Sequence, residues 1–321
     1  MTQTLLEVRG LRVEFPVGGV WLPAVRDLSF TLDRGEALGL VGESGSGKSV
    51  TALAILGILP PAARVTGGRA YLRGVDLLAL LPQELARRRG HDLSMVFQSP
   101  RTALNPIRTV GLQLEDVLVR HTELTRRQAR ARAVELLGDV QIPDPAGRAG
   151  AYPFELSGGM CQRVMIALAV ACAPALLIAD EPTTGLDVTT QAEILDLLQD
   201  LARRHATATV LITHDLGLAA ERCDRIVAMH AGHVVEIAPA RRLFAGPRHP
   251  YTAALVASTP EAGRALADLR PVPGGAPDLR AALPACRYRG RCPRAAPACD
   301  EPPLPRAQVA PDHLVACRFP L

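Results

Sequence analysis

The sequence predicts an α/β protein whose central sheet is mostly parallel and doubly wound, and two patterns carry this prediction. Segments with strand character alternate with helical segments over residues 176–230, as in parallel strands that are joined by helices. In addition, a glycine-rich loop at residues 42–49 lies between an apolar strand and a helix. Open α/β sheets bind ligands at such a strand end, so this loop marks the candidate ligand site.

The N-terminal part predicts a hairpin followed by the first strand of the main sheet. Residues 5–15 and 24–32 have the composition of strands, and the PVGG sequence at residues 16–19 favours a turn between them. Residues 37–41 are a short apolar run, which is typical of a buried strand. Residues 50–56 then continue as a helix after the glycine-rich loop.

The middle of the chain predicts further strands and a helical insertion. Residues 68–74 and 93–97 have the pattern of short strands. Between residues 110 and 138 apolar residues recur every three or four positions, which indicates an inserted helical lobe. The alternation then resumes, with predicted strands at residues 176–179, 209–213 and 226–230 and predicted helices at residues 190–205 and 216–221.

A change in composition near Pro239 predicts a domain boundary. Of the 27 prolines, 15 lie from Pro239 to the end of the chain. Because dense proline disfavours long helices and strands, we expect a separate, irregular extension with few regular elements. The predicted domains are therefore residues 1–239, with a helical subdomain at about residues 99–172, and residues 240–321.

Charge and composition argue against several classes of protein. The net charge is only +4, no long run of Lys and Arg occurs, and aromatic residues make up 3%, which disfavours a nucleic-acid partner. No apolar run reaches the length of a membrane span, and residues 1–9 show no signal-peptide pattern. We therefore expect a cytosolic protein, in which the seven cysteines are free or metal-bound rather than paired in disulfides.

Lys48 is the only lysine in the chain, and it lies in the motif G-x-x-x-x-G-K-[ST] at residues 42–49. In this motif backbone N–H groups cradle a polyphosphate, the compact ammonium reaches the outer phosphates, and Ser49 offers a hydroxyl to Mg²⁺. A chance glycine-rich turn is the alternative, and the flanking strand and helix argue against it. The predicted nucleotide-binding residues are Gly42, Glu43, Ser44, Gly45, Ser46, Gly47, Lys48, Ser49 and Val50.

Two adjacent carboxylates follow the apolar strand at residues 176–179. Asp180 and Glu181 lie where that strand ends, which is the ligand-binding edge of an open α/β sheet. Asp180 can hold Mg²⁺ through water or together with Ser49, and Glu181 can polarise an attacking water. Two neighbouring carboxylates with separate roles suit metal-assisted phosphoryl transfer.

The segment LSGGM at residues 156–160 precedes a helix and resembles the signature motif of the ATPase subunits of ATP-binding-cassette (ABC) transporters. Gln98, Asp187 and His214 stand at the places of three further motifs, in the family's order. The resemblance covers residues 5 to about 239. It implies a P-loop NTPase with a central mostly parallel sheet, an antiparallel β subdomain, a helical subdomain and an irregular cysteine-containing C-terminal extension.

The resemblance implies a catalytic or binding role for each matching residue. Phe15 would stack on the adenine of ATP, although it suits a core strand position nearly as well. Gln98 would sense the γ-phosphate, Glu181 would act as the base, and His214 would contact the γ-phosphate. The implied ligands of Mg²⁺ are Ser49, Gln98 and Asp180.

The signature residues would act on ATP that is held by a partner ATPase subunit. These residues are Ser157, Gly158, Gly159 and Met160. A helix start suits this use, because its N–H groups and dipole favour phosphate. Asp187 belongs to the motif called the D-loop. Two positions depart from the family pattern, since Cys161 replaces a polar or basic residue and Gly185 replaces alanine.

The C-terminal part resembles one subfamily, the ATPase subunits of dipeptide, oligopeptide and nickel importers. The resemblance lies in the HPYT sequence at residues 249–252 and the LNP sequence at residues 104–106. Four cysteines follow with the spacing C-x5-C-x6-C-x17-C, which is wider than in most structural zinc sites. They are Cys286, Cys292, Cys299 and Cys317.

We expect these four cysteines to hold an iron–sulfur cluster, since four thiolates can ligate one and the subfamily resemblance implies a [4Fe-4S] cluster. A zinc site is the second interpretation, and unligated thiols are the third. Cys161, Cys172 and Cys223 are expected to be small core residues.

The resemblance predicts a cytosolic subunit that hydrolyses ATP with Mg²⁺ and powers a bacterial peptide importer at the cytoplasmic face of the inner membrane. Its implied partners are a second ATPase chain, in a heterodimer, two membrane permeases and, indirectly, an extracytoplasmic substrate-binding protein. The alternatives are an importer of nickel or another small solute, a soluble ABC ATPase, and a catalytically inactive subunit. The chain has a single cassette and no heptad repeats, which disfavours a soluble ABC ATPase. The presence of Glu181 and His214 disfavours an inactive subunit.

Overall fold

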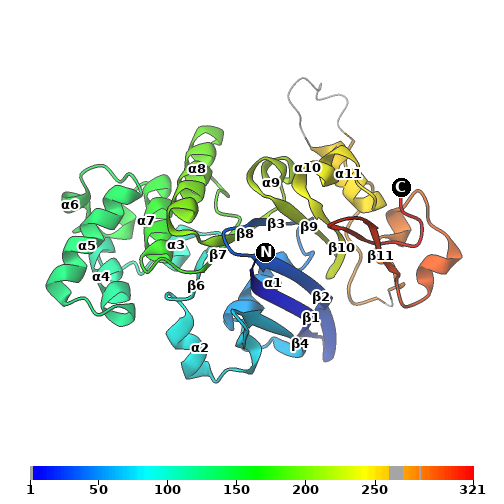
Figure 1. Cartoon of the computed structure of the whole chain (residues 1–321), viewed down its shortest axis with the longest axis horizontal. Coiled ribbons are helices and arrows are strands. Elements are labelled where there is room, and N and C mark those ends of the chain that lie inside the picture. The colour runs from blue at the N-terminus through cyan, green and yellow to red at the C-terminus, as the bar shows by residue number, and fades with distance from the viewer. Residues whose placement is uncertain (1–2, 260–269, 282) are drawn as a thin grey trace. The chain divides into compact units, whose positions relative to one another are not determined.

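The computed structural model describes residues 3–259, 270–281 and 283–321, and it divides into two compact units (Figure 1). Unit 1 comprises Gln3 and Leu80–Val210, and unit 2 joins Thr4–Ala79 to Leu211–Leu321. The C-terminal extension therefore belongs to the same compact unit as the glycine-rich loop. The division into domains at residues 1–239 and 240–321 stays a prediction.

Unit 2 contains an antiparallel sheet with the strand order β2-β1-β4-β5. Its elements are β1 (Thr4–Val17), β2 (Val20–Asp33), β4 (Arg64–Leu72), β5 (Val75–Asp76) and the 3-10 helix η1 (Leu77–Ala79). β1 and β2 form the expected hairpin, and Gly18 and Gly19 between them have φ values of 58° and 81°. Two consecutive positive φ values fit a two-residue hairpin turn, which glycine adopts without steric cost.

A second sheet in unit 2 places the glycine-rich loop at a strand end. β3 (Ala37–Val41) runs parallel to β9 (Arg225–His230), and β10 (His233–Pro239) pairs with β9 in the antiparallel direction. All residues of β3 except Ala37 are buried, as expected for an apolar strand between two neighbours. The helices of this unit are α1 (Lys48–Leu56), α9 (Leu216–Arg222), α10 (Ala240–Ala245) and α11 (Pro250–Ser258).

The extension is more regular than its composition predicts. β12 (His313–Ala316) pairs antiparallel with β10, and β11 (Arg306–Ala310) pairs with β12, so the extension adds two strands to the sheet. Besides α10 and α11, its described residues form the short 3-10 helices η4 (Arg289–Arg291) and η5 (Pro297–Asp300). Tyr251 and Tyr288 are fully buried in one apolar cluster with Val41 at the end of β3. Apolar burial therefore attaches the extension to the sheet.

Unit 1 combines a parallel strand pair with the helical lobe. β6 (Leu93–Val96) runs parallel to β7 (Leu176–Asp180), and β8 (Ala208–Thr213) contains the boundary between the two units. The helices are α2 (Pro82–Arg88), α3 (Pro100–Ala103), α4 (Val110–His121), α5 (Arg126–Asp139), α6 (Pro145–Arg148), α7 (Gly158–Val170) and α8 (Val188–His205), with the 3-10 helix η2 (Pro153–Glu155). α4, α5 and α7 pack together, as the green part of Figure 1 shows.

The helical pattern over residues 110–138 is divided into two helices because a new N-cap interrupts it. Thr125 accepts the N–H of Gln128, whose side chain in turn accepts the N–H of Thr125. This reciprocal capping box satisfies N–H groups that lack a partner at a helix start.

Among the described residues, no helix combines the length and the apolar character that a membrane crossing needs.

Candidate functional site

The glycine-rich loop of unit 2 connects the end of β3 to the start of α1. Gly42 and Gly47 have φ values of 151° and 102°, in the region that favours glycine. A Cβ atom at Gly42 would lie 2.2 Å from the carbonyl oxygen of Met229, and one at Gly47 would lie 2.8 Å from that of Ala24. The shape of the loop therefore depends on both glycines, because the atoms in the way are backbone atoms.

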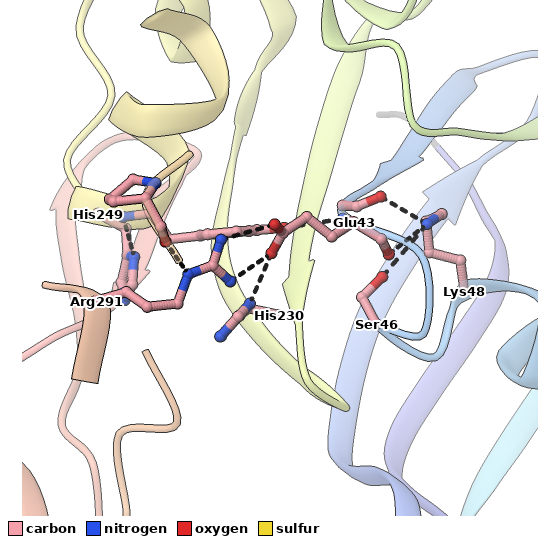
Figure 2. Close-up of polar contacts among 9 residues, drawn as sticks. Glu43, Ser46, Lys48, His230, His249 and Arg291 are labelled. Carbon is pink, nitrogen blue, oxygen red and sulfur yellow. Dashed lines mark hydrogen bonds and ion pairs between the residues drawn. The ribbon is translucent and has the colours of Figure 1, made fainter. Parts of the chain in front are cut away.

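Lys48 begins α1, and its ammonium group folds back onto the loop. Nζ donates to the carbonyl oxygens of Gly42 at 2.6 Å and Glu43 at 3.0 Å, and to the hydroxyl of Ser46 at 3.4 Å (Figure 2). The residue is only 5% exposed. These bonds hold the positive charge within the loop at a helix N-terminus, where phosphate groups bind favourably.

The remaining predicted residues of the loop are accessible to a ligand. Ser44, Gly45 and Ser49 are exposed, and Glu43 and Val50 are half-buried. A loop that excludes side chains at two glycines, carries one cation and exposes a hydroxyl fits a polyphosphate with Mg²⁺. Phe15 is half-buried in β1 opposite Leu22, and its contact with adenine stays a prediction.

Gln98 and Glu181 lie together in unit 1. Asp180 ends β7 and is 6% exposed, and Glu181 follows it with a φ of 43°. Nε2 of Gln98 and Oγ1 of Thr184 both donate to Oε2 of Glu181 at 3.1 Å. A positive φ is uncommon outside glycine and occurs at functional sites. The two hydrogen bonds orient the carboxylate, which suits a group that must direct a water molecule.

The signature residues form the start of α7. Ser157 is the N-cap, and its hydroxyl accepts the N–H of Met160 at 3.2 Å. A Cβ atom at Gly158 would contact nothing within 4 Å, so the surface above this residue is open. Cys161 is fully buried, and its thiol donates to the carbonyl oxygen of Pro153 at 3.2 Å. The departure at residue 161 therefore faces the core of the unit.

The motif after the carboxylates also caps a helix. The carboxylate of Asp187 accepts the N–H of Thr190 at 3.0 Å and its hydroxyl at 2.7 Å, and these hydrogen bonds lower the pKa of Asp187. Gly185 has a φ of 79°, so its departure from alanine supplies a conformation that glycine favours. His214 follows β8 in unit 2 and is exposed. The assigned roles of these residues stay predictions.

Two residues of the extension contact the loop, and the sequence analysis assigned neither of them to the site. The hydroxyl of Tyr251 accepts the N–H of Glu43 at 2.9 Å, and Arg291 forms two ionic hydrogen bonds of 2.7 Å with the Glu43 carboxylate. Tyr251 carried a signal, since it belongs to the HPYT segment. Arg291 lies beside Cys292 and carried no signal of its own for a contact with the loop.

The predicted iron–sulfur site is wrong. Its four cysteines line one cavity of about 10 Å³, room for roughly one water molecule and far too little for a cluster. Within residues 3–259, 270–281 and 283–321, no group of three or more His, Cys, Asp or Glu side chains is arranged to hold a metal ion, so the zinc alternative fails as well. The residues concerned are Cys286, Cys292, Cys299 and Cys317.

Three of these four cysteines lie in surroundings that disfavour the charged thiolate. Burial raises the pKa of Cys286 to about 11 and also raises the pKa values of Cys292 and Cys317. The wide spacing indicated a large ligand, but the packed side chains leave no space for one.

Comparison with known proteins agrees with the motifs. A family model described as ABC transporter matches residues 25–184, and one described as the oligopeptide/dipeptide transporter C-terminal region matches residues 235–299. The dipeptide transport ATP-binding protein DppD of Bacillus subtilis (strain 168) is 44% identical over 98% of this chain and 94% of its own length. The oligopeptide transport ATP-binding protein OppD of Salmonella typhimurium is 45% identical over 99% of this chain and 94% of its own.

A solved structure supports the fold. The dimeric ATP-binding cassette MJ0796, bound to ADP and Pi in a post-hydrolysis state, has a TM-score of 0.67 and 28% identity. It covers 74% of this chain and 99% of its own. The chain therefore belongs to the family of ABC transporter ATP-binding proteins that carry the oligopeptide/dipeptide transporter C-terminal region.

Proposed function

We propose that this chain is the ATP-binding and ATP-hydrolysing subunit that powers a bacterial importer of peptides. The observation that carries the proposal is the phosphate loop, in which Lys48 is held at the start of α1 by the loop's own oxygens. Two relatives at 44% and 45% identity over nearly the whole chain are named as dipeptide and oligopeptide transport ATP-binding proteins. They support peptides as the cargo.

The residues of unit 2 would bind the triphosphate of ATP. Lys48 supplies the cation, the backbone from Gly42 to Gly47 supplies the cradle, and Ser49 presents a hydroxyl to Mg²⁺. The metal ion, when bound with ATP, neutralises negative charge that develops on the phosphates. His214 would donate to the γ-phosphate.

The residues of unit 1 would carry the hydrolytic step. Glu181 accepts a proton from the attacking water at its carboxylate, and Gln98 and Thr184 hold that carboxylate in orientation. Asp180 would hold Mg²⁺ through water or together with Ser49. A general base that is positioned in this way typically accelerates a reaction by a factor of about 10²–10⁴.

The complete ATP site is proposed to need a second ATPase chain. Ser157 and Gly159 would contact ATP held by that partner, and the dimeric MJ0796 cassette supports such an arrangement. We propose a heterodimer that docks on two membrane permeases at the cytoplasmic face, with an extracytoplasmic binding protein delivering the peptide.

The test uses the whole transporter, purified with its partner chains and placed in lipid vesicles. We expect ATP hydrolysis to rise when peptide and binding protein are added, and this rise to vanish in Lys48→Ala. Parallel vesicles receive Ni²⁺ in place of peptide. Stimulation by Ni²⁺ alone would replace peptide with nickel as the cargo, and hydrolysis that responds to neither would refute the coupling to import.

A further inference from the structure

Glu43 of the phosphate loop is held from two sides. Within the loop, its carbonyl oxygen accepts a hydrogen bond from Nζ of Lys48 at 3.0 Å. From the extension, Nη1 and Nη2 of Arg291 donate to the two carboxylate oxygens at 2.7 Å each, and the Tyr251 hydroxyl accepts the Glu43 N–H at 2.9 Å. Figure 2 shows Glu43 between Arg291 and Lys48. One loop residue thus connects the phosphate-binding lysine to the extension.

Arg291 is the main positive charge on the Glu43 carboxylate. The Arg291 side chain is 8% exposed and that of Glu43 is 27% exposed, so water screens this pair weakly. Arg291 lowers the pKa of Glu43, and Glu43 raises the pKa of Arg291. His230 lies 3.6 Å from the same carboxylate, but burial lowers its pKa to about 4. His230 is therefore neutral near pH 7 and does not replace Arg291.

The extension presents Arg291 in a fixed orientation. Arg291 ends η4, its guanidinium lies 5.5 Å from the ring centre of Tyr288, and its Nε donates to the carbonyl oxygen of Pro273. The rings of Tyr288 and Tyr251 are 5.3 Å apart, and both side chains are buried. A side chain that is already ordered loses little entropy when it forms an ion pair.

We propose that Arg291 and Tyr251 are positioning residues for ATP binding, which act on the triphosphate through Glu43. Arg291 cancels a carboxylate charge that would otherwise repel the phosphates, and Tyr251 holds the backbone N–H of the same residue. The extension is then part of the ATP site. This inference rests on the proposed ATPase function and deepens it.

The test measures MgATP affinity of the purified full chain by equilibrium titration, and KM and kcat in the assembled transporter. Arg291→Gln should weaken MgATP binding about tenfold and raise KM equally, with kcat within about twofold, because ground-state binding is lost. The defect should shrink at high salt, since repulsion between charges is screened. Tyr251→Phe should weaken binding about fivefold, because it removes one hydrogen-bond acceptor.

Two further variants show whether a loss of MgATP affinity comes from charge repulsion or from disturbed folding. The double variant Glu43→Gln with Arg291→Gln removes both charges and should restore the affinity to within about threefold of the wild type. The matched control is Arg289→Gln, since Arg289 also lies in η4 but pairs with Asp300 at 3.0 Å. It should bind MgATP as the wild type does.

The proposal is overturned if Arg291→Gln binds MgATP as tightly as the wild type. It is also overturned if the double variant binds no better than the single one, because the loss would then come from disturbed folding. If the wild-type chain itself binds no MgATP, the proposed function is overturned as well. If the wild type binds MgATP and the variants do not behave as expected, only the role of Arg291 and Tyr251 is overturned.

Discussion

Glu236 attaches the C-terminal extension to the sheet, and Glu236→Ala is expected to destabilise unit 2 strongly. The residue lies in β10 and is 1% exposed. Its carboxylate accepts the backbone N–H groups of Arg248 at 2.7 Å and His249 at 2.9 Å. Nε2 of His313 in β12 lies 2.7 Å from the same carboxylate. The substitution removes this partner from the buried N–H of His249 and the buried imidazole of His313, and from the partly buried N–H of Arg248.

The contacts set the size of the effect. A buried group that loses its hydrogen-bond partner costs about 1–3 kcal/mol of unfolding free energy. Since one carboxylate serves all three groups, the costs overlap, and we expect about 4 kcal/mol of unfolding free energy to be lost. The free energy of unfolding falls by about 2.5 kcal/mol for each molar of urea, so the urea concentration at the unfolding midpoint should fall by about 1.5 M.

The single tryptophan provides the assay. Trp21 lies in β2 of unit 2, so its fluorescence during urea unfolding follows this unit. The matched control is Glu221→Ala in α9, where the side chain of Glu221 is 68% exposed and its carboxylate pairs with Arg222 at 3.4 Å. An exposed substitution should change the stability by no more than about 0.5 kcal/mol. If Glu236→Ala unfolds at the same urea concentration as Glu221→Ala, the anchoring role of Glu236 is refuted.

The other predictions concern catalysis and pH. Glu181→Gln should slow hydrolysis about 10²–10⁴-fold with little change in ATP affinity, and near-normal turnover with the partner site silenced would contradict this role. Lys48→Ala should abolish trapping of labelled nucleotide at this chain's site, whereas Ser157→Ala should impair trapping at the partner's site. If both substitutions reduce the label on the same subunit, the shared site is contradicted. Unit 2 should lose stability as the pH falls below about 6.5, because burial lowers the pKa of His230 to about 4 and that of His249 to about 3. The unfolded chain then binds more protons, and each histidine contributes about 1.4 kcal/mol per pH unit; equal urea midpoints at pH 7 and pH 5 would refute this expectation.

Local sequence determined the elements whose conformation depends on near neighbours. The phosphate loop was predictable because glycines, a preceding apolar strand and a following helix are all adjacent to Lys48 in the chain. The strands and helices over residues 176–230 were predictable for the same reason, since their periodicity is local. The predicted helical lobe at residues 110–138 consists of two helices, and the break between them is also local, because the capping box at Thr125 starts the second helix.

Tertiary structure alone decided which distant residues meet. Glu43 and Arg291 are 248 positions apart, and the sequence contains no signal that pairs them. The addition of β11 and β12 to the sheet depended on pairing between segments far apart in the chain. The four cysteines failed as a metal site because spacing along the chain specifies neither the volume between thiols nor their burial. Both quantities arise only when separate segments pack against one another, and this packing left a cavity of about 10 Å³ between the four cysteines.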